Sequence, residues 1–500
     1  MLLARIGNTF LRTISGFTTM PGTVYYVSND GSDNYSGKSQ SAPWKTLAYA
    51  SSHAVTAGDV IALKKGDIWS MGTATQINRG GTLGQPIIWD GGLWGTGSNA
   101  TILGNTDVTA GNGALVHISG CSYVTFQNIT VDASNYGFYG ISIGADTGSF
   151  GGSAQANETD IIIQDCSILD CYKAATYTNA VFVRCFNTDL QNVTIRRNYI
   201  NGASNHGIAF YPGKISDGAT LHSLINMYAG YNVITNCGKL NDAVAYDIMV
   251  SGRSINATLE HNTLLGGADG YVSGAIGVGC DNTTGEPFTQ YPTGLVVRYN
   301  GIRISDGGGK NGIYIQNGAP VSATVYYNKI YALNRYGIQI DAAADPSWAG
   351  VDLKFYNNTV VSDAYNTFRD QTSITSGVTI KNNIFLERSV VGNYAGMAFV
   401  GLTNYLPVHD HNLYYKKENQ TYKVVMTQTA DTYYTPAQIT TWEATGIAVD
   451  PLLVDISSFD FGLQTDSSCI NAGVDVGLTT DYAGNPIVGN PDIGCYEYIA

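Results

Sequence analysis

A short segment recurs along most of the chain, and it constrains the fold more than any other feature of the sequence. In each copy, apolar or aromatic residues alternate up to an Asn, and two or three further strand-forming residues follow it. These residues are Asn128, Asn198, Asn232, Asn262, Asn300, Asn328, Asn358, Asn383 and Asn412, and Cys166 takes the same position in the segment IIIQDCSIL. Successive copies are 25 to 38 residues apart, a period typical of solenoid repeats. We therefore interpret each copy as one coil of a solenoid.

A second strand follows most of these segments after a further 9 to 15 residues. Its copies read like Gly-Ile-x-Ile, with the Gly-like position at Gly140, Ala180, Gly207, Asp247, Ala275, Gly312 and Gly337. Because the strands are constant and the loops between them vary, the pattern predicts an all-β, right-handed parallel β-helix. Each coil would contribute three short strands and stack about 4.8 Å from the next. An inward Asn at the same turn of every coil would bond to its neighbours and satisfy the buried backbone there, so we expect the Asn column to be structural.

Other repetitive architectures fit the sequence less well. A β-sandwich needs hairpins, and few two-residue Asn-Gly or Asp-Gly loops join alternating strands in this sequence. β-Propeller repeats are longer and more regular than these. A helical solenoid requires a sustained period of 3.6 residues, which the sequence lacks.

Charge composition narrows the class of partner. Asp, Glu, Lys and Arg make up only 13% of the 500 residues, the formal net charge is −13, and Lys and Arg form no block. Nucleic acid and anionic membranes are therefore poor partners. No run of 18 apolar residues is present, so we predict no membrane insertion. Arg5 and Arg12 interrupt the apolar stretch of residues 1–20, which therefore does not read as a secretory signal.

The eight cysteines are dispersed and form no CxxC pair. This spacing argues against a zinc site and favours small core-filling side chains on strands. Cys469 and Cys495 flank one terminal segment, and the sequence leaves open whether they pair.

Both ends of the chain resemble a known superfamily. Residues 24–69 read VYYVSNDGSDNYSGKSQSAPWKTLAYASSHAVTAGDVIALKKGDIW, and residues 450–498 contain the pieces DPLLVD, INAG, DYAGNP and PDIGCYEY. Together with the coils, these modules are similar to pectate-lyase-like right-handed β-helix proteins. The expected organisation is an N-terminal extension (1–23), an N-terminal module with a capping helix (24–110), coils with the Asn ladder (111–415) and an irregular β-rich C-terminal cap (416–500).

The capping helix is expected to plug one end of the solenoid. Ser41 is a plausible N-cap, Pro43 suits the first helical turn, and Leu47, Ala50 and Ala54 form an apolar face. A plugged end hides strand edges that would otherwise pair with other chains.

The resemblance implies that a polysaccharide groove follows the Gly-Ile-x-Ile strands. If alternate residues point outward, two exposed rows follow: first Ser142, Phe182, Ala209, Met249, Gly277, Tyr314 and Gln339, then Gly144, Arg184, Tyr211, Ser251, Gly279, Gln316 and Asp341. Aromatic faces beside amide and carboxylate groups suit sugar rings, and we take Met249, Tyr314, Gln316, Gln339 and Asp341 as substrate-binding candidates. An ordinary solvated sheet face is the competing interpretation.

Charged residues at the ends of neighbouring strands are the catalytic candidates. Arg253 and Asp281 occupy the same offset on adjacent coils, about 5 Å apart, and Lys214 ends the coil before them. A lyase acting on a uronic acid must neutralise the carboxylate and remove the adjacent C5 proton, for which Lys214, Tyr211 and Arg253 are suitable. His206 is a further base. A surface Arg–Asp pair beside a solvated Lys is the competing interpretation.

Hydrolysis and metal chemistry have weaker support in the sequence. A hydrolase needs two carboxylates roughly 5 to 9.5 Å apart, whereas the expected separation of the Asp281 and Asp341 Cα atoms is about 12 Å. Ca²⁺ assists several related lyases, but DDxD-like clusters are missing here, and the nearest acidic groups are Asp146 and the pair Asp341 and Asp345. The string from His409 to His411 suggests a metal site, but strand alternation would split its side chains between two faces.

These observations predict an extracellular or virion-surface protein that binds and cleaves an acidic or neutral polysaccharide, with lyase chemistry favoured over hydrolysis. The alternatives are a secreted bacterial lyase and, from another class, a noncatalytic glycan-binding adhesin or structural fibre. A homotrimer would favour a place in a virion tail, and a monomer would favour the secreted enzyme.

Overall fold

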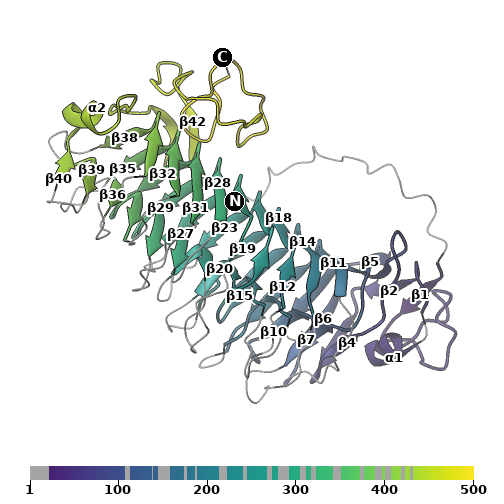
Figure 1. Ribbon diagram of the computed structural model, residues 1–500. Helices are drawn as coiled ribbons and strands as arrows, with labels where there is room; N and C mark the ends of the chain where they lie inside the picture. Colours follow the sequence, from purple (N-terminus) through teal and green to yellow (C-terminus); the bar gives the residue numbers. More distant parts are fainter. Residues whose placement is uncertain are drawn as a thin grey trace.

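The coils stack into one elongated solenoid (Figure 1). The computed structural model describes residues 22–53, 55–106, 113–137, 139–144, 158–173, 177–185, 188–212, 222–239, 245–266, 273–279, 292–304, 311–316, 322–341, 351–371, 377–388, 397–399, 407–417, 423–427 and 432–499. Three long sheets run along the solenoid, and each coil contributes one parallel strand to each of them. This right-handed parallel β-helix confirms the predicted fold class.

Sheet A precedes the Asn positions in each coil. It consists of β1 (Val24–Val27), β2 (Val60–Lys65), β5 (Ile87–Gly95), β8 (Val124–Gln127), β11 (Glu158–Gln164), β14 (Leu190–Arg196), β18 (Tyr228–Gly230), β22 (Thr258–Glu260), β25 (Leu295–Arg298), β28 (Ser322–Tyr326), β31 (Asp352–Tyr356), β34 (Val378–Lys381) and β37 (Val408–Asp410), with β17 (Leu224–Ile225) and β21 (Ser254–Ile255) beside that path.

Sheet B follows the Asn positions. Its strands are β3 (Ile68–Met71), β6 (Ala100–Gly104), β9 (Ile129–Asp132), β12 (Ser167–Cys171), β15 (Tyr199–Ala203), β19 (Val233–Thr235), β23 (Thr263–Gly266), β26 (Gly301–Ile304), β29 (Lys329–Ala332), β32 (Thr359–Ser362), β35 (Ile384–Glu387) and β38 (Leu413–Lys416).

Sheet C contains the Gly-Ile-x-Ile strands. Its strands are β4 (Thr75–Ile77), β7 (Ala114–Ile118), β10 (Tyr139–Ile143), β13 (Val181–Val183), β16 (Ile208–Phe210), β20 (Ala245–Ser251), β24 (Ser273–Gly279), β27 (Asn311–Gln316), β30 (Ile338–Asp341), β33 (Phe368–Asp370), β36 (Met397–Phe399), β39 (Val425–Thr427) and β40 (Thr432–Tyr434).

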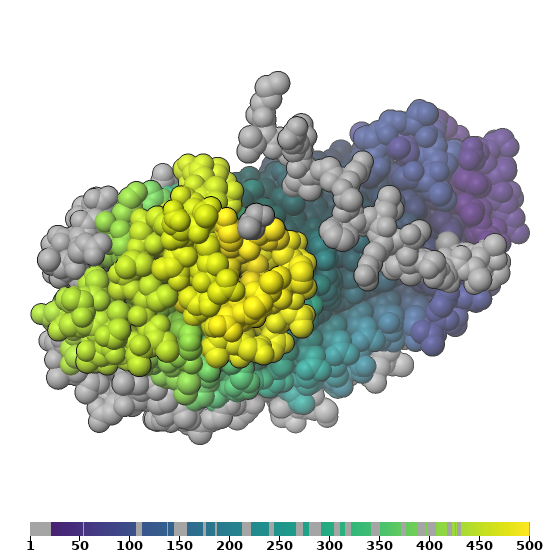
Figure 2. Space-filling model, turned by 90° about the horizontal axis from the view of Figure 1, so that it is seen from above, coloured from purple at the N-terminus to yellow at the C-terminus, as the bar shows by residue number. Residues whose placement is uncertain are grey.

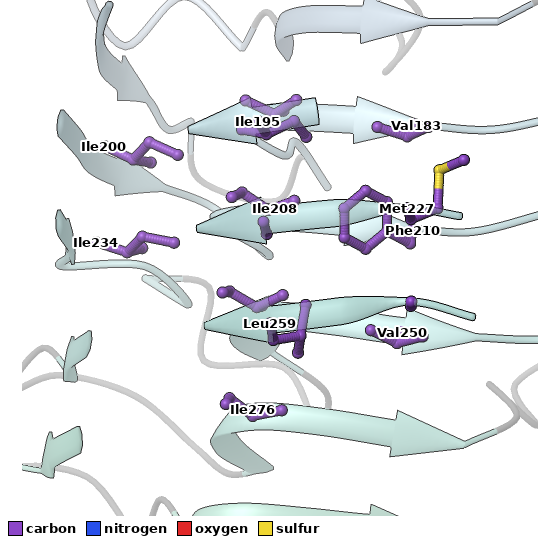
Figure 3. Packing of buried hydrophobic residues seen from close by; sticks show 14 of the residues in the cluster. Val183, Ile195, Ile200, Ile208, Phe210, Met227, Ile234, Val250, Leu259 and Ile276 are labelled. Carbon is purple, nitrogen blue, oxygen red and sulfur yellow. The ribbon is translucent and has the colours of Figure 1, made fainter. Parts of the chain in front are cut away.

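The core is built of rows in which like side chains stack from coil to coil (Figure 3). Val183, Phe210 and Val250 occupy matching positions of neighbouring sheet C strands, and Ile200 and Ile234 do the same in sheet B. All of these side chains are buried. Stacking apolar side chains on one another removes apolar surface from water in each coil, which stabilises the solenoid along its whole length.

A ladder of eight Asn side chains runs through the corner between sheets A and B. The rungs are Asn198, Asn232, Asn262, Asn300, Asn328, Asn358, Asn383 and Asn412. The Asn262 Oδ1 accepts bonds from the backbone N–H and the Nδ2 of Asn232, at 3.1 and 3.0 Å. Its Nδ2 donates to the Ala229 carbonyl and to the Oδ1 of Asn300, at 2.9 and 3.0 Å. The side chains therefore satisfy a buried turn, as predicted.

The first copy of the repeat departs from the prediction by one residue. Gln164 pairs with Gln127, and Ser167 pairs with Thr130, so the residue that matches Cys166 is Ile129, not Asn128. Asn128 instead has a φ of 55° and donates to Asp90. It belongs to a row of left-handed residues that directly precede the ladder position in every coil, and Asn is one of the few residues that adopt this conformation readily.

The ladder ends differently at its two ends. At the start, the backbone N–H of Cys166 donates to the Asn198 Oδ1 at 3.0 Å, so a Cys takes the place of a rung, as the repeat alignment indicated. At the other end, the buried Glu443 accepts bonds from the backbone N–H and the Nδ2 of Asn412, at 2.6 and 3.0 Å. The Tyr414 hydroxyl also donates to Glu443, at 2.7 Å.

A short helix closes the N-terminal end, but it begins later than predicted. Helix α1 (Leu47–Ser52) has Thr46 as its N-cap, whose hydroxyl accepts the Tyr49 N–H at 3.1 Å. Ser41 therefore does not cap it, because the preceding residues form turns and a bridge from Trp44 to Val27. Leu47 and Ala50 are buried as expected, and Ala54 lies outside the described residues. Among the residues that the structure describes, no helix is long and apolar enough to cross a membrane.

The C-terminal cap is irregular and packs against the side of the last coils (Figure 2). It contains the 3-10 helix η2 (Pro436–Gln438), helix α2 (Ile439–Trp442) and the antiparallel strands β41 (Leu453–Asp455) and β42 (Asp460–Leu463). The Lys329 ammonium of β29 lies among the rings of Phe459, Tyr482 and Tyr496, at 4.4, 4.9 and 5.6 Å. These cation–π contacts join the cap to the coils.

The seven cysteines in the described ranges are buried, and the thiols of Cys469 and Cys495 are free. Burial raises the pKa of both of these thiols to about 12. A thiol that is neutral and shielded from solvent reacts slowly, because the thiolate is the nucleophile.

We therefore expect Ellman's reagent to modify at most one of the eight thiols in the folded protein, because Cys280 alone lies outside the described residues. All eight should react after unfolding in denaturant. Two or more fast-reacting thiols under native conditions would contradict this burial.

Glu158, at the start of β11, is a buried carboxyl whose Oε1 accepts the Gly120 N–H while its Oε2 has no bonding partner. Burial raises the pKa of Glu158 to about 7. A carboxyl whose pKa is higher in the folded than in the unfolded state favours folding below its ordinary pKa of 4.5, and that contribution is lost as the pH rises through 7.

The Glu158→Gln variant should therefore lose part of the pH dependence of stability. Between pH 5 and pH 8 the free energy of unfolding of the wild type should fall by about 2–3 kcal/mol more than that of the variant. Urea unfolding at both pH values measures this difference, and parallel pH profiles would refute it.

Replacing a ladder rung tests the corner between sheets A and B. Asn262→Ala removes the bonds that the Asn232 N–H and Nδ2 donate to Asn262 and the bond that Asn262 donates to the Ala229 carbonyl, so we expect a loss of about 3 kcal/mol in the free energy of unfolding. Asn34→Ala, at an exposed turn, is the matched control and should change stability by less than about 0.5 kcal/mol. A loss in Asn262→Ala as small as the one expected for the control would show that the ladder is dispensable.

Candidate functional site

The outward rows of sheet C have the register that the repeat predicts. Ser142, Phe182, Ala209, Met249, Gly277, Tyr314 and Gln339 pair in succession from strand to strand. In the second row, Ser251, Gly279, Gln316 and Asp341 pair in the same way. In a parallel sheet, aligning the coils by sequence therefore also aligns them in space.

The prediction that the side chains of the first outward row are exposed is wrong for much of that row. Ser142, Ala209, Met249 and Gln339 are buried. Met249 and Ala209 form an apolar cluster with Tyr246, against which Phe182, Tyr211 and Tyr314 pack. The Tyr246 ring occupies the space beside Gly277, where a Cβ would lie 2.5 Å from it. Aromatic rings of neighbouring positions thus cover the small residues of this row.

A polar network lies next to this cluster, on β27 and β30. The Tyr314 hydroxyl donates to the Asp341 Oδ2 at 2.9 Å. The Gln339 Nε2 donates to the Gln371 Oε1 at 2.8 Å and, more weakly, to the same Asp341 oxygen at 3.4 Å. The Asn311 Nδ2 donates to the Gln339 Oε1 at 2.9 Å, while its buried Oδ1 has no partner. Three predicted substrate-binding residues, Tyr314, Gln339 and Asp341, are therefore in one hydrogen-bonded group.

Two arginines flank this group. Arg369 follows Gln339 in the same outward row, lies 4.6 Å from the centre of the Tyr336 ring and donates to the Tyr336 hydroxyl. Arg335 lies 5.9 Å from the same ring. The positive charges of both arginines act on Tyr314. Tyr314 thus lies in a setting of two cations, a carboxylate and several amides, and we call this group the sheet C site (Asn311, Tyr314, Gln339, Asp341, Arg369).

Burial and the adjacent Asp341 carboxylate raise the pKa of the Tyr314 phenol well above its ordinary value, although Arg335 and Arg369 oppose the shift. Tyr314 is therefore a neutral hydrogen-bond donor at physiological pH. Its proton is directed toward Asp341, and its oxygen lone pairs remain free to accept a bond.

Three of the five predicted catalytic residues, Tyr211, Arg253 and His206, lie in the described part of the chain. Lys214 and Asp281 lie outside the described residues, and so does the side chain of Gln316. Tyr211 belongs to the apolar cluster, and Arg253 lies at the turn that leads from β20 to β21. The buried His206 accepts the Tyr246 N–H on its Nδ1 at 3.1 Å, which occupies the lone pair that a base would use.

Carboxylates and metal ligands are sparse at the sheet C site. Asp341 is the one carboxylate in the outward rows among the described residues, and no group of three or more His, Cys, Asp or Glu side chains that could hold a metal occurs there. Asp146 and Asp345, the nearest acidic groups for Ca²⁺, lie outside the described ranges. In the string from His409 to His411, His409 contacts Glu443 at 3.1 Å and His411 contacts Asp410 at 2.8 Å.

The sequence prediction missed Arg369, Arg335, Asn311 and Gln371. Arg369 lies in the segment TFRD, which lacks the Gly-Ile signature although it follows Gln339 by a spacing of 30 residues. Extending the row by coil spacing alone would have found Arg369. Asn311 precedes the Gly-like position and faces Gln339 from the neighbouring strand, a contact that becomes visible only in three dimensions.

Comparison with known proteins yields only distant similarities. No protein-family model matches the chain, and no curated protein matches it. Among solved structures, it is similar to a GH136 lacto-N-biosidase from Eubacterium ramulus (15% identity, 77% of this chain and 68% of the other, TM-score 0.47). It is also similar to XylC in complex with xylose (11%, 95% and 98%, 0.48) and to the pectate lyase Pel9A (14%, 97% and 98%, 0.40). The fold and the site described above rest on the chain itself.

Proposed function

We propose that the sheet C site binds an acidic polysaccharide and cleaves it by β-elimination. The observation that carries this proposal is the Tyr314–Asp341 hydrogen bond, flanked by Arg335 and Arg369 on the outward face of sheet C. The resemblance of both chain ends to pectate-lyase-like proteins supports a polysaccharide as the substrate class.

The residue types suit the binding of a sugar acid. A guanidinium can hold a carboxylate through two parallel hydrogen bonds, and Arg369 is oriented by its contact with Tyr336. The amide of Gln371, which is only half-buried, can bond to a hydroxyl group, and the buried Gln339 and Asn311 hold that amide in the network. The aromatic cluster beside them offers apolar surface for the sugar ring.

The proposed reaction uses Tyr314 and Asp341 as a proton relay. The Tyr314 oxygen accepts the proton from the carbon next to the substrate carboxylate, while its own proton passes to Asp341. The electron pair of the broken C–H bond forms the new C=C bond, and the glycosidic C–O bond breaks with its pair going to the leaving oxygen, which water protonates. The raised pKa of Tyr314 keeps the phenol protonated before the reaction, so the proton that passes to Asp341 is present.

Paired-carboxylate hydrolysis has less support from the described residues, because Asp341 has no second carboxylate in its row. Glycan binding without cleavage is the alternative of another class. We further propose that the protein acts outside a cell or on a virion surface. A homotrimer in light scattering would favour assembly in a virion tail, and a monomer would favour a secreted enzyme.

Turnover tests the proposal directly. The protein is incubated with a panel of uronate-containing and bacterial surface glycans, and both the absorbance of unsaturated uronates and the release of reducing ends are followed. We expect both to rise for the wild type and the rate to fall by at least about 100-fold in Tyr314→Phe and Arg369→Gln. Reducing ends without absorbance would indicate hydrolysis, and neither signal would leave a binding protein.

A second Tyr–Asp–Arg group on sheet B provides the matched control. The Tyr331 hydroxyl donates to Asp363 at 2.7 Å, and Arg388 donates to Tyr331 at 3.1 Å. Tyr331→Phe removes the same atom as Tyr314→Phe and should leave turnover unchanged. Equal losses in both variants would mean that stability, not chemistry, limits the rate, and full activity in Tyr314→Phe would exclude the relay.

A further inference from the structure

The corner between sheets A and B is covered along only part of its length. In the last coils, residues at or near this corner bond to the C-terminal cap: the Asn357 and Asn382 side chains donate to the Asp492 and Val474 carbonyls, at 3.0 and 2.7 Å. Four to five coils before Asn357, the same corner carries exposed rings, because Tyr231 is 51% and Tyr199 is 44% exposed. Strands β11, β14 and β18, which lead into this stretch, lie between the two ends of the solenoid (Figure 1).

The exposed rings are held in fixed positions. The Tyr231 ring stacks on His261 at 4.6 Å, and His261 stacks on Tyr299 at 4.9 Å. The phenol end of Tyr228 fills the space beside Gly230 and donates to Glu260 at 2.8 Å. Rings that are already ordered lose little conformational entropy when a ligand packs on them.

Two adjacent arginines complete this surface. Arg197 forms an ion pair with Asp165 at 2.6 Å. Arg196 donates from its Nε to the Gln164 Oε1 at 2.8 Å and has no carboxylate partner among the described residues. Gly230 pairs with Arg196 on the neighbouring strand and has no side chain that could neutralise the charge of Arg196. In the described part of the chain, the two arginines therefore share the carboxylate of Asp165, on a protein whose formal net charge is −13.

We propose that Arg196, Arg197, Tyr199, Tyr228 and Tyr231, the corner patch, form a second binding site for a carboxylated polysaccharide. The rings offer apolar faces to sugar rings, and the Arg196 guanidinium offers its Nη donors to a sugar carboxylate. The patch lies on a different side of the solenoid from sheet C, so it would hold a polymer without occupying the sheet C site. The assignment of a carboxylated polysaccharide as the ligand rests on the proposed function. The identification of the corner patch as a binding surface does not.

The test is affinity electrophoresis of the full chain through gels that contain polygalacturonate, alginate or, as a neutral polymer, dextran. In Arg369→Gln, which weakens the sheet C site, we expect an acidic polymer still to retard the protein. Adding Arg196→Gln and Tyr231→Ala should weaken that retardation by about tenfold in apparent Kd, and dextran should retard neither protein. Adding Tyr35→Ala instead, at a tyrosine that is 49% exposed near the N-terminal end, should change nothing.

The outcomes separate this inference from the proposed function. Equal retardation with and without the patch substitutions, at unchanged unfolding midpoints, would overturn the corner patch, whatever the turnover results. Loss of all retardation in Arg369→Gln alone would also overturn it, because one site would then account for binding. Failure of the wild type to bind either acidic polymer would refute the carboxylate specificity of the patch, whereas full turnover in Arg369→Gln would refute only the role of the sheet C site.

Discussion

The need to satisfy buried backbone at a sharp turn is the constraint on which the rest of this structure depends. At the corner between sheets A and B, one residue in each coil adopts a left-handed conformation and the next turns its side chain inward. Without a partner, each N–H at this corner would cost about 1–3 kcal/mol. The Asn ladder supplies the partner in every coil from Cys166 to Asn383, and it repeats because an Asn carries both the donor and the acceptor that its neighbours require.

Fixing that corner fixes the register everywhere else. Once the ladder aligns neighbouring coils, parallel pairing carries the alignment to sheet C, where Tyr314, Gln339 and Arg369 follow one another in one outward row. The sheet C site is thus a consequence of stacking rather than of any local motif. Its residues come from three coils, whose matching positions Tyr314, Gln339 and Arg369 are 25 to 30 residues apart in sequence.

Because the fold depends on stacked coils, its periodic features could be predicted from the sequence and its non-periodic contacts could not. The solenoid, the ladder and the outward register are periodic, so spacing alone predicted them. What failed was not periodic: Asn128 lies one residue before the ladder position, Thr46 rather than Ser41 caps α1, and the Tyr246 ring beside Gly277 changes exposure along the row. Arg369 was missed because its strand lacks the Gly-Ile signature, although it keeps the coil spacing. Whether an outward side chain is buried depends on its contacts with side chains of neighbouring coils, and the spacing of residues along the sequence does not reveal those contacts.

The ladder also has a direction. In each rung the amide oxygen faces the preceding coil and the Nδ2 faces the next, so eight side-chain dipoles point the same way along the solenoid axis. Their positive ends face the C-terminus, where the last Nδ2 meets the carboxylate of Glu443. An α-helix stabilises an anion at its N-terminus for the same reason. The solenoid thus has an electrical polarity that no strand possesses alone, and the cap supplies the charge that balances it.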